Sequence, residues 1–344
     1  MDGLADEGRA LTSGLLNHAG TGAKRLPWAA ARPLLFTLLV VAAACGAYLF
    51  KLRDDGIFAC PAGGYGADQY LAYCHANEYG DYEHGAFWFG LEPAATRAAG
   101  NADLLFLGDS HLQFALSTSA TADWFAAAKL RYYLLGFGYG EDVGFTGRLL
   151  GRLRPRARIY VINVDGFFDR SETVAAKAAT GDWASFFHFE GKRWWQELHR
   201  PVCGAVPQLC GQSYVIYRSR ATGAYHAMGE GAFVGRPVAA DDSVDMGAVT
   251  SALALGHEFL STASIDHRCV LLTIVPNGAT KSETAALIAK GLGRELIAPK
   301  VEGLETFDGI HLDAASAERW SAAFLRAAAP EIERCRREAG HAAS

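Results

Sequence analysis

Short apolar runs alternate with helix-like segments along most of this chain, and that alternation constrains the fold more than any other feature. The strand-like runs lie at 103–108, 130–135, 158–164 and 269–275, and the helix-like segments lie at 111–129, 141–153, 251–264, 282–292 and 314–328. Each strand-like run is almost continuously apolar, which is typical of parallel strands covered by helices on both faces. The sequence therefore predicts an α/β fold, with a parallel sheet between two layers of helices.

Two stretches interrupt this alternation. Residues 54–100 contain Gly, Tyr and two cysteines with little regular pattern, so we expect a loop-rich lead-in. Residues 166–249 are aromatic and polar, and we expect an insertion in an α/β domain that spans 101–330. Trp194 and Trp195 within it are candidates for substrate binding. Stacking on sugar rings, contact with a membrane interface and packing in a core or lid are the open alternatives for them.

An apolar, uncharged run covers Pro33–Phe50 and is bounded by Arg32 and Lys51. Its length is roughly that of a helix that crosses a bilayer. Residues 1–32 lack periodicity, so we expect a disordered tail. The cations before the run favour a cytoplasmic tail and an extracytoplasmic (periplasmic) C-terminal domain. We therefore predict a single-pass anchor over 33–50 in the cytoplasmic (inner) membrane. A buried core helix and a cleaved signal peptide are the alternatives.

The chain has seven cysteines, of which Cys45 lies inside the apolar run. In an oxidising compartment the other six form up to three disulfides. We expect the local pairs Cys60–Cys74 and Cys203–Cys210, which leave Cys269–Cys335. Metal ligation is the alternative, but no CxxC or Cys/His cluster with zinc spacing occurs, so we predict no metal site.

The net charge of the chain is −5, and its Lys and Arg residues are spread along the sequence. Binding to phosphate backbones needs a concentrated basic face. We therefore expect no nucleic-acid partner.

Two short motifs indicate chemistry. Gly108-Asp109-Ser110-His111 follows a strand-like run, and Asp308-Gly309-Ile310-His311 precedes the last helix-like segment. A serine nucleophile needs a base, and the base needs a carboxylate that orients it. We predict Ser110 as nucleophile, His311 as base and Asp308 as its partner. A helix cap at Ser110 and a simple turn at Asp308 are the alternatives, but the two motifs together favour catalysis.

These motifs resemble those of the SGNH (GDSL-type) hydrolase superfamily, over about residues 101–328 without the insertion. The resemblance implies a flavodoxin-like α/β fold and a Ser-Asp-His triad whose last two members share a DxxH motif. It places that triad at Ser110, Asp308 and His311, and it implies no cofactor.

The resemblance also implies an oxyanion hole made by the serine amide, a glycine after the second strand and an asparagine after the third. Gly138 and Gly140 are the candidates for the glycine. Asp165 follows the third strand in place of an asparagine, so the oxyanion hole is incomplete or rebuilt. Asn277, in a Pro-Asn-Gly element, is a further candidate, and we predict that Asp165 contacts substrate.

The apolar run and the missing asparagine are similar to those of membrane-anchored SGNH-like proteins that acylate extracytoplasmic polymers, such as the teichoic-acid D-alanylation and alginate O-acetylation proteins. This likeness implies acyl-ester transfer onto hydroxyls of an envelope glycan, beside a membrane-bound O-acyltransferase. An esterase and a non-catalytic glycan-binding scaffold are the alternatives. The string Asp109-Ser110-His111 also fits the start of a dinuclear metallophosphoesterase, but the further metal ligands of that class are missing.

Overall fold

The structure is a computed structural model that describes residues 28–61, 65–74, 82–229, 234–239, 241–263, 265, 267–278 and 280–341. It divides into two compact units, Met1–Tyr48 and Leu49–Ser344, which we describe separately. The predicted cytoplasmic tail falls outside the described residues up to residue 27.

The first described element is the helix α1 (Trp28–Asp54). Its part from Arg32 to Asp54 contains an 18-residue stretch with a mean hydropathy of 2.1 and is long and apolar enough to cross a membrane. The hydrophobic side chains along it, such as Leu34, Phe36 and Leu39, are exposed among the residues that the structure describes. Length and composition fit both a membrane anchor and a signal sequence.

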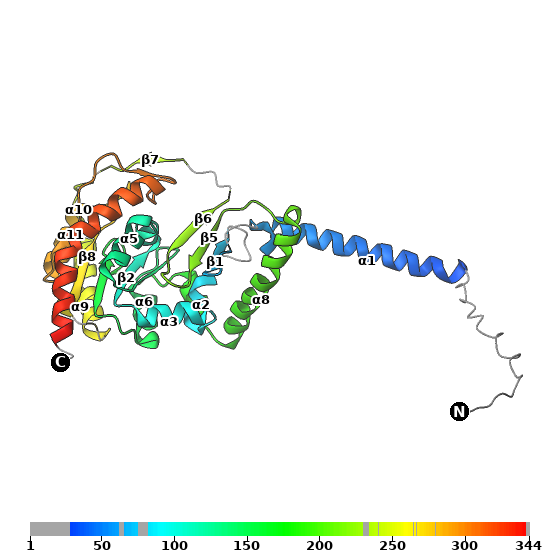
Figure 1. The fold of residues 1–344 in the computed structure, drawn as a ribbon, viewed down its shortest axis with the longest axis horizontal. Helices are drawn as coiled ribbons and strands as arrows, with labels where there is room; N and C mark the ends of the chain where they lie inside the picture. The colour runs from blue at the N-terminus through cyan, green and yellow to red at the C-terminus, as the bar shows by residue number, and fades with distance from the viewer. Residues whose placement is uncertain are drawn as a thin grey trace, which may run out of the picture. The chain divides into compact units, whose positions relative to one another are not determined.

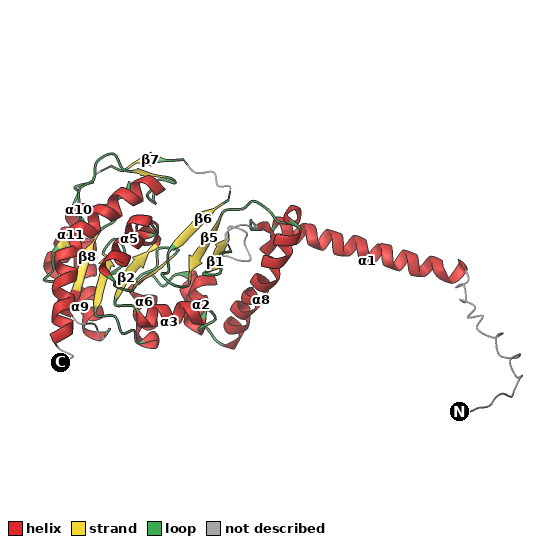
Figure 2. Ribbon diagram, in the orientation of Figure 1, coloured by secondary structure: helices red, strands yellow, loops and turns green. Residues whose placement is uncertain are grey.

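The centre of the second unit is a five-stranded parallel sheet (Figures 1 and 2). Its strands, in their order across the sheet, are β3 (Tyr132–Phe137), β2 (Leu104–Asp109), β4 (Ile159–Asn163), β8 (Val270–Thr273) and β9 (Leu296–Ile297). Numbered along the chain, this is the order 2-1-3-4-5 of flavodoxin-like doubly wound sheets. The prediction of an α/β fold with a parallel sheet is confirmed. Strand β9 was not predicted, because a strand of two residues leaves no periodic pattern.

Both faces of this sheet are buried, since alternate residues of each strand enter different cores. In β2, Leu105 and Leu107 belong to one core, whereas Leu104 and Phe106 belong to the other. The first core also contains residues of α6 (Val143–Leu153), α9 (Met246–Thr262) and α10 (Ser282–Gly291). The second contains residues of α4 (Ser110–Leu116), α5 (Ser119–Ala128) and α11 (Ala314–His341). The sheet therefore lies between two helical layers, as predicted.

The predicted helix 111–129 is two helices. Helix α4 ends at Leu116, and Thr118 caps α5 by accepting the backbone N–H of Thr121 at 3.1 Å. A threonine outside the helix satisfies an otherwise unpaired amide, which makes a new helix start favourable here.

The lead-in and the insertion, far apart in the sequence, form one antiparallel sheet. It consists of β1 (Gln69–Cys74), β5 (Val215–Ser219) and β6 (Tyr225–Met228), in that order. The same two stretches also hold η1 (Ile57–Ala59), α2 (Tyr82–Phe89), α3 (Pro93–Asn101), α7 (Val174–Ala179), α8 (Trp183–Ala205), η2 (Pro207–Leu209) and β7 (Arg236–Pro237). Strand β7 pairs with β10 (Glu305–Thr306).

The part of residues 54–100 that the structure describes, expected to be loop-rich, contains η1, β1, α2 and most of α3. Helix α2, with the sequence YEHGAFWF, is buried from Tyr82 to Phe87. A helix enclosed nearly all round has no polar face, so its sequence lacks the periodicity that reveals an amphipathic helix.

All three predicted disulfides are present. Cys60–Cys74, Cys203–Cys210 and Cys269–Cys335 have Cα–Cα distances of 6.1, 5.8 and 5.5 Å. The third joins η3 (His267–Cys269), just before β8, to the long helix α11. Disulfides of this kind persist in oxidising compartments, so they point to an extracytoplasmic domain.

Candidate functional site

Ser110 is the first residue of α4, directly after β2 ends at the carboxyl edge of the parallel sheet. Asp109 caps this helix, because its Oδ1 accepts the backbone N–H of His111 at 3.0 Å. The strand-to-helix turn therefore fixes the position of Ser110 where doubly wound sheets hold their ligands.

The turn before α11 brings a histidine and a carboxylate to this serine. His311 Nε2 lies 2.8 Å from Ser110 Oγ, and His311 Nδ1 lies 2.6 Å from Asp308 Oδ2. A carboxylate accepts the proton on Nδ1, which leaves Nε2 able to accept the serine proton. The three predicted triad residues are thus brought together in the order that nucleophile activation requires.

Backbone contacts hold the turn in place. Asp308 Oδ1 accepts the N–H groups of Ile310 and His311 at 2.9 and 2.7 Å. Gly309 has a φ of 90°, which only glycine adopts without strain. Burial acts to raise the pKa of Asp308, but the hydrogen bonds from His311, together with its charge, lower that pKa to about 2. Asp308 is therefore ionised at neutral pH, as an orienting partner must be.

Two aromatic rings pack against His311. Phe307 stacks on it with 5.6 Å between ring centroids, and Phe114 lies at 4.8 Å. These contacts restrict the imidazole to the orientation that reaches Ser110.

Ser110, Asp308 and His311 line a cavity of about 210 Å³. Its other lining residues are mainly aromatic and come from the lead-in, α4, the loop after β3, the insertion and the turn before α11: Ala72, Tyr73, Glu83, Phe114, Gly138, Tyr139, Tyr214, Ile216, Tyr225 and Phe307. The predicted triad thus opens into a small, mostly apolar cavity.

Comparison of the chain with protein-family models, with curated proteins and with solved structures finds no match. The assignment of the site therefore depends on its geometry.

Gly138 lines the cavity, but its amide already has a partner. Its N–H donates to Glu83 Oε1 at 2.8 Å. The Glu83 carboxylate also accepts the Tyr225 hydroxyl at 2.7 and 2.8 Å and Arg218 Nη1 at 2.8 Å. Gly140 adopts a φ of 65° and is not among the residues lining the cavity. In this arrangement neither glycine presents a ready amide to an oxyanion at Ser110.

Sequence reasoning missed Glu83 and Tyr225, which line the cavity, and Arg218, which donates to Glu83 without lining the cavity. Arg218 is completely buried, and Glu83 is 5% exposed. One feature of the sequence could have indicated Glu83: it is a charged residue inside the apolar, aromatic segment of α2. A charge buried in such a segment needs a partner.

A polar group that includes His111 adjoins the triad. His111 Nδ1 lies 2.8 Å from Asp109 Oδ2, and its ring centroid lies 5.3 Å from that of His311. Burial acts against its charge, but Asp109, with Asp165 and Asp308, raises the pKa of His111. Asp165 and the buried Asn277 approach each other, with 3.4 Å between Oδ2 and Nδ2. Burial raises the pKa of Asp165. Neither Asp165 nor Asn277 lines the cavity, although both were predicted for the site.

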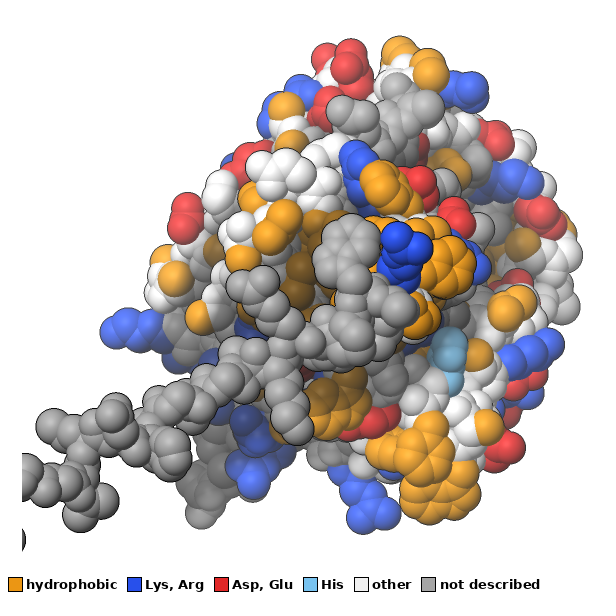
Figure 3. Space-filling view, turned by 90° about the vertical axis from the view of Figure 1, so that its right-hand side faces the viewer, with side chains coloured by type: hydrophobic (Ala, Val, Ile, Leu, Met, Phe, Trp, Pro, Cys, Tyr) orange, Lys and Arg blue, Asp and Glu red, His pale blue; other side chains and the backbone are white. Residues whose placement is uncertain are grey.

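Trp194 and Trp195 lie on α8, outside the lining of the cavity. Trp194 is 64% exposed, whereas Trp195 is partly buried and packs edge-on against Phe58 at 6.2 Å. Trp183 and Phe187 of the same helix are also exposed. Figure 3 shows hydrophobic side chains in separate groups between charged ones on the face that it presents. Core packing therefore explains Trp195 but not Trp194.

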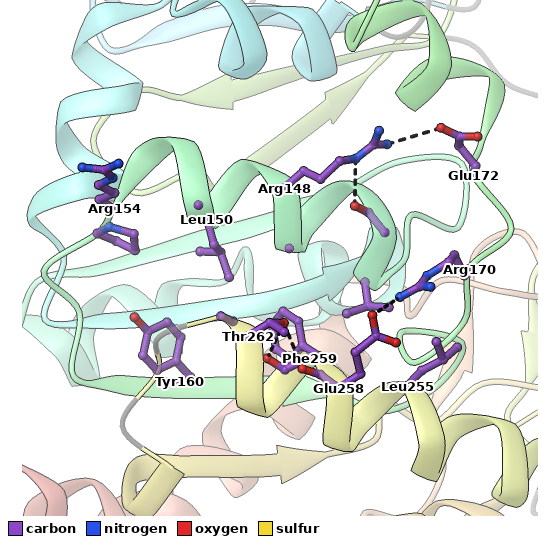
Figure 4. Close-up of a pocket in the computed structure, with 16 residues that line it drawn as sticks. Arg148, Leu150, Arg154, Tyr160, Arg170, Glu172, Leu255, Glu258, Phe259 and Thr262 are labelled. Atoms are coloured by element: carbon purple, nitrogen blue, oxygen red, sulfur yellow. Dashed lines mark hydrogen bonds and ion pairs between the residues drawn. The ribbon is translucent and has the colours of Figure 1, made fainter.

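A larger cavity of about 970 Å³ lies between α6 and α9 (Figure 4). Arg148 and Arg170 at its wall pair with Glu172 and Glu258 at 3.5 and 2.8 Å. None of the described residues that line it is a serine, cysteine or histidine. Its lining therefore offers no nucleophile next to a base.

One group of side chains in the described part of the chain has metal-ligand spacing: His199, Cys203 and Cys210. The two cysteines form a disulfide, so they offer no thiolate to a metal. His199 contacts the Cys60 carbonyl and the Tyr65 hydroxyl, both at 3.2 Å. This group is a structural one.

Proposed function

We propose that the chain is a serine acyltransferase of the SGNH type, which forms an acyl-serine at Ser110 and passes the acyl group to a hydroxyl. The observation that carries the proposal is the connected set of contacts from Ser110 Oγ through His311 to Asp308, at 2.8 and 2.6 Å. The flavodoxin-like strand order and the position of Ser110 at the carboxyl edge of the sheet support it.

The reaction has two halves. In the first, His311 Nε2 removes the proton of Ser110 as Oγ attacks the carbonyl carbon of the donor ester. The bond to the donor alcohol breaks, and the alcohol oxygen takes the proton from Nε2. In the second, Nε2 removes the proton of an acceptor hydroxyl, whose oxygen attacks the acyl carbon, and Ser110 leaves and regains its proton. Asp308 stabilises the imidazolium in both halves.

The acceptor that we propose is a hydroxyl of an extracytoplasmic polysaccharide or cell-envelope glycan. The apolar helix α1 and the three disulfides support a domain anchored outside the cytoplasmic membrane, with the N-terminus inside. The likeness of the apolar run and the missing asparagine to membrane-anchored polymer-acylation proteins adds a membrane-bound O-acyltransferase as the partner that delivers the acyl group. Hydrolysis uses the same site with water as acceptor, so an esterase is the second candidate.

A fluorophosphonate probe tests the nucleophile, because it reacts with activated serines. We expect the full-length protein to be labelled at Ser110 and the Ser110→Ala variant to remain unlabelled. Ser261→Ala, which removes a serine of α9 whose side chain bonds only its own helix at Glu258 O, is the matched control and should be labelled like the wild type. Absence of labelling under conditions that label a control esterase would leave the non-catalytic scaffold as the better proposal.

Transfer and hydrolysis are separated by the fate of a radiolabelled acyl group. Incubation of the full-length protein with a labelled ester and a hydroxyl-bearing oligosaccharide should move the label to the oligosaccharide. Release of the label only as free acid would identify an esterase.

A further inference from the structure

The cavity beside Ser110 has two chemically different walls. The triad forms one, and the other consists of aromatic rings from separate parts of the fold, among them Tyr73 from β1, Phe114 from α4 and Tyr214 from the insertion. A wall of this kind excludes water and favours apolar groups.

Glu83 is the charged residue among the aromatic lining residues, and its carboxylate is paired with protein donors. The two oxygens of Glu83 accept from Gly138, Tyr225 and Arg218, so its acceptor positions face protein donors. Arg218 Nη1 lies 2.8 Å from Glu83 and its guanidinium lies 4.9 Å from the ring centroid of Phe137. The negative charge of Glu83 at the cavity is therefore compensated by the positive charge of Arg218.

The tyrosines of the wall add no charge. Burial raises the pKa values of Tyr73, Tyr214 and Tyr225 above the ordinary value for a phenol. All three phenols remain protonated throughout the physiological pH range.

Tyr139 lies in the loop after β3 and also lines the cavity. Its φ of 64° is the left-handed conformation, which is unfavourable for a residue other than glycine. Its side chain is 55% exposed and packs edge-on against Tyr73, with 6.2 Å between centroids. The loop thus holds an aromatic ring at the open side of the cavity despite a backbone penalty.

The size of the cavity limits what enters it. A volume of 210 Å³ corresponds to about seven water molecules at roughly 30 Å³ each. A sugar ring there would leave most of its hydroxyls without partners, because the aromatic wall offers few of them. An apolar chain has no hydrogen bonds to lose in the same place, and each methylene that it buries there favours binding.

We propose that this cavity is the acyl-group pocket and that it selects short, uncharged acyl chains, of about two to six carbons, over aminoacyl and long fatty acyl chains. The inference rests on the proposed function, since it assigns the substrate class of the same serine. An aminoacyl group would bring an ammonium into a space where the carboxylate is already paired. Removing that ammonium from water costs more free energy than its contact with aromatic faces returns.

The charge selection is tested with an isosteric pair of esters. The 4-nitrophenyl esters of 2-methylpropanoate and alanine differ by a methyl group in place of the ammonium. With the full-length protein, and after division by each ester's uncatalysed hydrolysis rate, we expect kcat/KM to be at least about tenfold higher for the 2-methylpropanoyl ester. An equal or higher value for the alanyl ester would overturn the proposal.

The size selection is tested with acetyl, butanoyl and dodecanoyl esters. We expect kcat/KM for dodecanoyl to lie at least about tenfold below that for butanoyl, and Tyr139→Ala or Tyr214→Ala to narrow this difference. Trp183→Ala, which removes an exposed aromatic ring outside the cavity, is the matched control and should leave the profile unchanged.

The outcomes separate the two proposals. If neither the probe nor any ester reacts at Ser110, the proposed function fails and this inference falls with it. If Ser110 reacts but the chain-length profile is flat and identical in the two tyrosine variants, the proposed function stands and the acyl pocket is wrong.

Discussion

The buried pair of Glu83 and Arg218 gives the sharpest stability prediction, because it joins the lead-in, the insertion and the cavity wall. We consider Arg218→Met, which keeps the length of the side chain and removes its charge. The guanidinium is completely enclosed, contacts Glu83 at 2.8 Å and donates to the carbonyl of Leu134 at 2.6 Å. The variant leaves the Glu83 carboxylate buried with only Gly138 and Tyr225 as donors.

The expected cost follows from that uncompensated charge. Removing one partner of a buried ion pair destabilises proteins by about 3–5 kcal/mol, whereas replacing both partners by neutral groups is often close to neutral. Arg218→Met should therefore cost about 3–5 kcal/mol, and adding Glu83→Gln should restore part of that loss, with a coupling energy of about 1–3 kcal/mol.

Urea unfolding of the full-length protein in detergent, followed by tryptophan fluorescence, measures these differences. Arg200→Met is the control, because Arg200 pairs with Glu197 on α8 while both side chains are about half exposed, at 51% and 52%. An exposed pair of this kind contributes less than about 1 kcal/mol. A loss below about 1 kcal/mol for Arg218→Met, or a double variant whose loss equals the sum of the two single losses, would refute the reasoning.

Three further predictions concern the triad, a buried histidine and a disulfide. Asp308→Asn should lower kcat for a 4-nitrophenyl ester by about 10⁴-fold without unfolding the protein, because the histidine loses the partner that fixes its tautomer. Burial lowers the pKa of His199, so below about pH 6.5 the unfolded chain binds a proton that the folded chain does not. The melting temperature should therefore fall as the pH is lowered from 7.5 to 5.5, and this fall should be smaller in His199→Gln. Replacing Cys269 and Cys335 by Ala opens a loop closed over 66 residues and should cost about 4 kcal/mol in urea unfolding, against about 2 for the bridge that spans seven residues.

The parallel sheet and the contact of Ser110 with His311 and Asp308 could be predicted because each leaves a local mark in the sequence. Apolar runs predict β2, β3, β4 and β8, and short motifs contain Ser110 and His311. The topology then brings the two motifs together. The carboxyl ends of the parallel strands share one edge of the sheet, and the turn before α11 lies at that edge. The serine and the histidine therefore meet although they lie 201 residues apart.

The roles of the aromatic residues on α8 could not be predicted, because they depend on how this helix packs against the rest of the insertion and the lead-in. Trp194 and Trp195 are neighbours on α8, and successive residues of a helix point about 100° apart. One tryptophan is exposed and the other packs against Phe58. Helix geometry alone therefore argues against one ligand that contacts both Trp194 and Trp195. Which face of α8 is buried depends on how the whole insertion packs.

The oxyanion side of the site shows the limit of motif reasoning most clearly. The glycine run after β3 does reach the cavity, but the Gly138 amide bonds Glu83, a residue of the lead-in 55 positions away. Glu83 in turn bonds Arg218 and Tyr225, which come from β5 and β6. No local pattern links these segments, because their contacts form only when the antiparallel sheet pairs β1 with β5. The lead-in and the insertion are therefore parts of the site itself. These contacts join the segments of the compact unit Leu49–Ser344.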